Sequence, residues 1–140
     1  MTGAALLLTA LLFGGMALYS GGFAAFLFTA LPSETAGPLL RRAFPHFYLF
    51  CIATAAVAAP TAWAADPLSA LLLVAIAVTA GLAREVLMPA INAATDAGDK
   101  RRFGTLHGLS VALTLGHIVV AGIVLIRLAS SLPPLPAFRP

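Results

Sequence analysis

The sequence has few charged residues, and this scarcity excludes an ordinary soluble domain. Only 9% of its 140 residues are Asp, Glu, Lys or Arg, whereas 61% are hydrophobic, and the mean hydropathy is +1.01. Soluble globular domains carry about 25% charged residues. No charged side chain precedes Glu34 in the chain. The composition therefore indicates an integral membrane protein.

Cysteines and familiar catalytic motifs are also scarce. Cys51 is the single cysteine, so no intrachain disulfide can form, and its place in an apolar run favours a packing role. The sequence contains no nucleophile elbow, phosphate-binding loop or close pair of zinc ligands. The sequence therefore does not predict an enzyme that uses the catalytic motifs of soluble proteins. A haem-linked membrane oxidoreductase is the one enzyme class that stays open.

What the sequence does have is long apolar runs. The first has no basic leader and exceeds the ~7–15 apolar residues of a signal peptide, so it predicts a retained transmembrane helix. Crossing a bilayer takes roughly 20 apolar residues. We predict an all-α, antiparallel four-helix membrane bundle in one domain (residues 1–130), followed by a proline-rich extended tail (131–140). The four expected spans are residues 3–30, 44–63, 67–92 and 103–129.

Three prolines are expected to mark helix boundaries. Pro45 is placed at the start of the second span, where a missing amide donor does no harm. Asp66 followed by Pro67 predicts an N-cap and the first residue of the third span. Pro89 is expected to kink or stop that span.

The basic residues lie between the predicted spans and predict the orientation. Arg41 and Arg42 fall in the first expected loop, and Lys100, Arg101 and Arg102 fall in the third. The positive-inside rule places both loops in the cytoplasm and both termini outside. These loop residues explain the high isoelectric point of 9.8, so nucleic-acid binding is not needed to account for it. Arg41 and Arg42 are expected to act as topology signals or to contact anionic lipid headgroups.

Glycines in the first and fourth spans predict close helix contacts. Small residues let two membrane helices approach closely. Packing within the bundle is their expected use, and the residues concerned are Gly14, Gly15, Gly21, Gly22, Gly104 and Gly108.

Polar side chains on the fourth span form the most specific pattern. Four of them fall within roughly 80° of one another on a helix, and polar groups in hydrocarbon are costly unless they face the bundle interior. Residues of the second and third spans, with Tyr48 as a further member, are expected at a similar depth. The predicted intramembrane polar site consists of His46, Arg84, Glu85, His107, Ser110, Thr114 and His117. The deepest member, His117, is expected to bond to a backbone carbonyl or to Tyr19.

Three functions fit this pattern. The first is transporter-like handling of a small cationic or metal-containing solute through the polar layer. The second is a membrane redox protein in which His46 and His107, from different helices, bind haem or a metal ion. The third is an accessory or scaffold protein whose polar layer only locks the bundle. Four helices form a narrow pathway, so a homo-oligomer or a membrane complex is expected.

Several ordered motifs resemble the transmembrane protein 205-like family. They are "LPSETAG", "FPHFY", "AREVLMPAINA" and "FGTLHGLS", and the similarity covers residues 31–116. Thr114 stands where that family often has asparagine. The resemblance implies a small four-span membrane protein and favours transport, because the human member is linked to platinum-drug resistance with export proposed. A looser architectural likeness to copper-resistance D-like proteins and membrane protoporphyrinogen oxidase implies haem instead.

Overall fold

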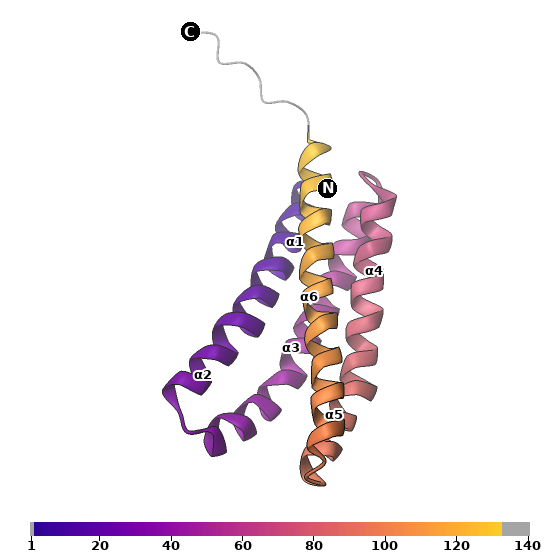
Figure 1. Ribbon diagram of the computed structural model, residues 1–140. Helices are drawn as coiled ribbons and strands as arrows, with labels where there is room; N and C mark the ends of the chain where they lie inside the picture. The colour runs from indigo at the N-terminus through magenta and orange to yellow at the C-terminus, as the bar shows by residue number, and fades with distance from the viewer. Residues whose placement is uncertain (1, 133–140) are drawn as a thin grey trace.

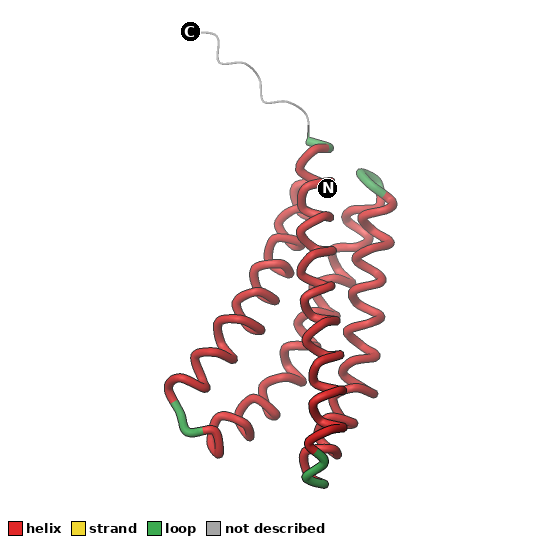
Figure 2. The backbone as a smooth tube through the Cα atoms, viewed as in Figure 1, coloured by secondary structure: helices red, strands yellow, loops and turns green. Residues whose placement is uncertain are grey.

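The computed structural model describes residues 2–132, and within them the protein is all-α (Figures 1 and 2). Four helical spans are long and apolar enough to cross a membrane, which confirms the predicted four-helix membrane architecture. Two of the spans contain a short π-helix. The elements are α1 (Thr2–Ala17), η1 (Leu18–Phe23), α2 (Ala24–Ala30), α3 (Ser33–Trp63), α4 (Pro67–Leu82), η2 (Ala83–Leu87), α5 (Met88–Asp96) and α6 (Lys100–Ser130).

The helix boundaries differ from the predicted ones near the basic residues. Helix α3 begins at Ser33, well before Phe44, so Arg41 and Arg42 lie on a helix rather than in a loop. Pro45 is inside α3 instead of at its start. Membrane helices tolerate such prolines because neighbouring groups can satisfy the freed backbone carbonyls. Most of the predicted tail, residues 133–140, lies outside the described residues.

The third span runs through Pro89 and reaches Asp96. Of the two expected effects of Pro89, a kink or a stop, the stop is therefore wrong. The π-helix η2 ends at Leu87, two residues before Pro89. A π-helix inserts an extra residue into the hydrogen-bond ladder, and the change of register lies where the proline removes a donor. The fourth span begins earlier than expected, at Lys100. Asp99 caps it by accepting a hydrogen bond from the backbone N–H of Arg102.

The core is built mainly from small side chains. Helix α3 packs between α1 and α4, and α6 packs against α1, α4 and α5. Alanines of α3 line its buried face, and larger buried side chains such as Leu12, Leu73 and Val124 fill the remaining space. Small residues allow close approach of helices where lipid offers no hydrophobic driving force between them. Large apolar side chains instead face outward along all four spans.

A second, smaller core holds together α2 and the beginning of α3. Leu27, Ala36 and Leu40 form it, separately from the main core. Figure 1 shows α2 and the first turns of α3 leaning away from α5 and α6. The uncharged span Thr2–Ala30 is longer than a ~30 Å hydrocarbon core requires, and an inclined path accommodates the excess length.

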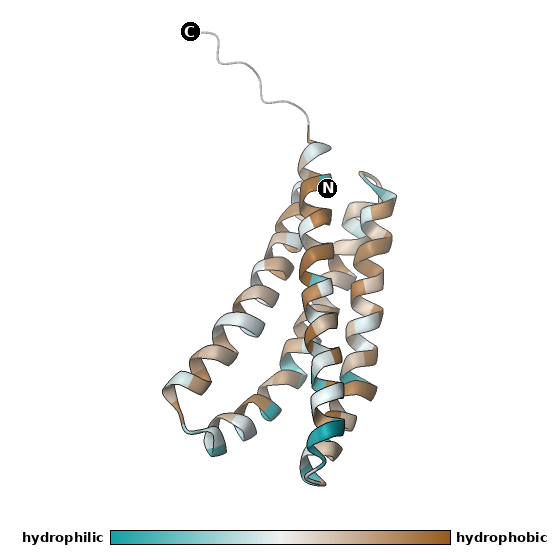
Figure 3. Cartoon of the chain, in the orientation of Figure 1, coloured by the Kyte–Doolittle hydropathy of each residue, from teal (hydrophilic) through white to brown (hydrophobic). Residues whose placement is uncertain are grey.

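An ion pair connects this leaning segment to the rest of the bundle. The Arg41 guanidinium donates two hydrogen bonds to the Asp96 carboxylate, at 2.6 and 2.8 Å. Both side chains are exposed at the end of the molecule that also carries residues 100–102. Figure 3 shows hydrophilic residues concentrated at the α5–α6 junction. We call this end the basic end, and the opposite one the Asp66 end.

The glycines predicted to pack have different surroundings. A Cβ on Gly15 would lie 2.4 Å from Cζ of Phe50, so α1 and α3 do approach closely there. Gly22 has only Leu18 of its own segment nearby. For the other four, no described atom lies within 4 Å of the Cβ position, so packing inside the bundle is not observed; they are Gly14, Gly21, Gly104 and Gly108.

Candidate functional site

Tyr48 and Ser110 join α3 to α6 inside the bundle. Their hydroxyl oxygens are 3.0 Å apart. Tyr48 is only 3% exposed, and Ser110 is half-buried. The backbone carbonyl of Ser110 also accepts a hydrogen bond from the Thr114 hydroxyl, which is buried one turn further along. Two members of the predicted polar site are therefore connected here, and Tyr48 joins them as expected.

Thr79 and His117 form a second contact, between α4 and α6. Oγ1 of Thr79 is 2.7 Å from Nε2 of His117 and 2.6 Å from the Ala75 carbonyl, to which it donates. Since a hydroxyl has a single proton, Thr79 accepts from His117, and the imidazole carries its proton on Nε2. His117 is 8% exposed. Its partner is therefore a threonine rather than the predicted carbonyl or Tyr19, whose ring instead stacks on Phe47.

Arg84 and Glu85 lie on the π-helix η2 and pair with each other. Nη1 of Arg84 donates to the Glu85 carboxylate. Glu85 is largely exposed, whereas the Arg84 side chain is more than half covered. Nε of Arg84 is buried and has no hydrogen-bond partner among the described residues. A buried donor without an acceptor lowers the stability of the fold by about 1–3 kcal/mol. Arg84 Nε is therefore a destabilising group that a bound acceptor would satisfy.

These contacts follow one another along the bundle. At ~1.5 Å per residue, Ser110 lies about 10 Å from His117 along α6, toward the basic end. Helix η2, which carries Arg84, contacts both α3 and α6. We call the following residues the polar column: Tyr48, Thr79, Arg84, Glu85, Ser110, Thr114 and His117.

The two remaining histidines of the predicted site are not part of the column. His46 on α3 and His107 on α6 are both exposed, and among the described residues neither is hydrogen-bonded to a member of the column, whereas the exposed Glu85 is bonded to Arg84. The His107 ring stacks on Phe103 of its own helix, with centroids 5.3 Å apart. Within residues 2–132, no three His, Cys, Asp or Glu side chains are grouped closely enough to hold a metal ion. Haem or metal ligation by His46 and His107 stays a prediction.

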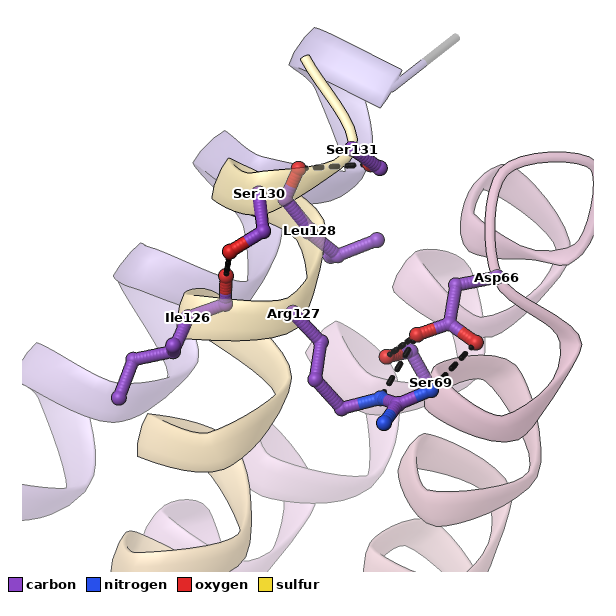
Figure 4. Close-up of polar contacts among 7 residues, drawn as sticks. All are labelled: Asp66, Ser69, Ile126, Arg127, Leu128, Ser130 and Ser131. Carbon is purple, nitrogen blue, oxygen red and sulfur yellow. Dashed lines mark hydrogen bonds and ion pairs between the residues drawn. The ribbon is translucent and has the colours of Figure 1, made fainter.

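A polar network closes the Asp66 end of the bundle (Figure 4). Arg127 of α6 donates two hydrogen bonds to the Asp66 carboxylate, at 2.8 and 2.9 Å. Ser69 donates a third, at 2.6 Å. These donors hold the pKa of Asp66 far below its usual range, because they favour the ionised form; Arg127 contributes most. Asp66 is at the helix N-cap as predicted, but its side chain bonds to other side chains rather than to backbone amides.

Sequence reasoning missed Thr79 and both arginine–aspartate pairs. Thr79 is the one polar side chain in an otherwise apolar stretch between Ser69 and Arg84. That isolation, at a depth similar to His117, was the signal that could have identified it. Arg41 was interpreted as a topology signal or a lipid contact, and no partner was assigned to Arg127. The partner of Arg41 became predictable only once the third span was extended to Asp96, whereas Asp66 and Arg127 already lay at neighbouring span ends in the prediction.

The fold and its polar contacts define the class of protein as a small integral membrane protein with a four-helix bundle. Residues 7–100 match the family described as "Domain of unknown function (DUF4149)". The matched residues make up most of the chain, so the protein belongs to this family. No curated protein and no solved structure matches the chain.

Proposed function

We propose that the protein is transporter-like and handles a small cationic or metal-containing solute at the polar column. The observation that carries the proposal is the buried, unpartnered Nε of Arg84 within a membrane-spanning segment. Intramembrane ionisable groups are costly and commonly mark solute pathways. The proposed relation to the transmembrane protein 205-like family, based on the motifs in residues 31–116, also favours solute handling.

The residues of the column suggest how a solute would be held. Glu85 supplies a carboxylate, and His117 supplies an imidazole whose Nε2 contacts Thr79. The unpaired Arg84 donor favours a solute that also carries an acceptor, such as a metal complex with anionic ligands. A solute of this kind would compete with Glu85 for Arg84 and replace the missing acceptor.

Transport assays in proteoliposomes test the proposal, with hydrated divalent metal ions and anionic metal complexes as separate probes. Arg84→Gln should reduce uptake at least tenfold, because it removes the charged donor while keeping an amide. Arg101→Gln is the matched control, since Arg101 is exposed at the basic end and outside the column. Equal uptake by the wild type, Arg84→Gln and empty vesicles would contradict the proposal for these probes.

The scaffold function is a second candidate, and one observation favours it. Tyr48 with Ser110, and Thr79 with His117, satisfy each other without any ligand. If they only lock the bundle, Tyr48→Phe should lower thermal stability without changing uptake or ligand binding. A stable Tyr48→Phe protein that has lost uptake would exclude a purely structural role.

Two finer predictions accompany this proposal. A haem-binding form would show a Soret absorption band that the double variant His46→Ala/His107→Ala lacks. Both residues are exposed, so the variant should fold.

A homo-oligomer is proposed because four helices leave little room for a pathway. Crosslinking of reconstituted protein at several dilutions in lipid tests it, and a monomer at every dilution would refute it.

A further inference from the structure

An apolar groove lies along the first span at its π-helix. Its lining comes from one face of α1, η1 and α2 and from one side chain of α3: Gly15, Leu18, Tyr19, Gly22, Phe23, Phe26 and Phe50. The groove has a volume of about 590 Å³ and opens outward. Figure 1 shows α1 and α2 on the side of the molecule away from α4, with α3 packed between α1 and α4. The lining belongs to helices that are long and apolar enough to span a membrane, so we expect the groove to face hydrocarbon.

Two glycines and a phenylalanine determine the depth of this groove. The Phe50 ring reaches the position that a Cβ on Gly15 would take, so the ring and the glycine together close its end. Gly22 presents no side chain, and the one nearby group is Leu18. A larger side chain at position 22 would fill the groove from within. Large residues of the lining, such as Leu18 and Phe26, form exposed walls around this floor.

A basic row on α3 continues from the groove toward the basic end. Phe50, His46 and Arg42 are spaced by four residues, so they follow one another along the helix surface over about 12 Å. His46 and Arg42 are exposed. Whereas Arg41 is paired with Asp96, Arg42 has no ion-pair partner within the described part of the chain. A cation is therefore free at the level where a lipid headgroup would meet the protein.

We propose that this groove is a binding site for an anionic phospholipid. One acyl chain occupies the groove beside Tyr19 and Phe50, and the phosphate accepts hydrogen bonds from Arg42 and His46. The apolar lining recognises the chain, and the unpaired positive charge distinguishes an anionic headgroup from a zwitterionic one. The site is separate from the polar column and does not depend on the proposed transport function.

The test uses quenching of tryptophan fluorescence by lipids with brominated acyl chains. Trp63 is the only tryptophan and lies near the Asp66 end, so Trp63→Phe/Phe26→Trp moves the reporter to the groove. Vesicles contain a fixed fraction of brominated lipid, either phosphatidylglycerol or phosphatidylcholine, in a background of the other. The groove reporter should show about fivefold stronger apparent binding of the brominated anionic lipid.

Matched variants separate the two parts of the site. In the reporter background, Arg42→Gln should remove the headgroup preference, whereas Arg101→Gln should retain it. Gly22→Leu should remove the quenching excess by filling the groove. The adjacent Gly21→Leu should not, since Gly21 is exposed and does not line the groove. Equal quenching by the two lipids, or a preference unaffected by both Arg42→Gln and Gly22→Leu, would overturn the proposal.

Discussion

The contact between Thr79 and His117 offers the sharpest test of the bundle interior. Thr79→Val keeps the shape of the side chain but removes the oxygen that accepts the imidazole proton. His117 is 8% exposed, so water can replace that acceptor only poorly. An unsatisfied buried donor costs about 1–3 kcal/mol, whereas hydrogen bonds between membrane helices average about 0.6 and reach about 1.7 kcal/mol. We expect Thr79→Val to lower the free energy of unfolding by about 1 kcal/mol.

A double-mutant cycle measures this contribution. The variants are Thr79→Val, His117→Leu and their combination, unfolded reversibly in mixed micelles with increasing SDS. Because the double variant leaves neither partner unpaired, it should be more stable than the two single effects predict, with a coupling of about 1 kcal/mol. Thr61→Val is the control, since Thr61 donates to a carbonyl of its own helix and has no partner side chain on another helix. A coupling near zero, with Thr79→Val no worse than Thr61→Val, would refute the hydrogen bond.

Two further predictions concern the helix contact and the Asp66 end. Gly15→Ala should be about 1 kcal/mol less stable than Gly14→Ala in the same unfolding assay. The methyl group at position 15 would force the Phe50 ring to move, whereas position 14 has open space. Equal stabilities would show that the ring is not packed on Gly15. The lowered pKa of Asp66 means that its bond to Arg127 contributes stability above the unfolded-state pKa of about 3.9, and that this contribution is lost as pH falls toward the lower folded-state value. The melting temperature of the wild type should therefore fall more steeply than that of Asp66→Asn below about pH 4, and parallel curves would contradict the pairing.

Depth along each helix was predictable from the sequence, because it depends only on counting residues from a charged end. This is why Ser110 and Tyr48 were expected at one level and are found in contact. The partner of Arg41 was not predictable in the same way. Pro45 was expected at the start of the second span, because proline is disfavoured in a helix interior, and this placed Arg41 in the preceding loop. In α3 the prolines are accommodated, and the helical rotation aims Arg41 at Asp96.

The direction of each side chain around α6 explains the remaining differences. The buried residues of this helix centre on the direction of Ser110 and His117. At 100° per residue, His107 lies about 60° away from Ser110, at the edge of that face, and Gly108 lies about 160° away. The apparent stripe from His107 to His117 is real, but only its inner part reaches the neighbouring helices. Once Ser110 and His117 are known to face the interior, the same angles show that Gly104 and Gly108 face outward, toward lipid or another molecule. Periodicity thus provides relative angles, and it needs one interhelical contact, such as Tyr48 with Ser110, before those angles identify an interior.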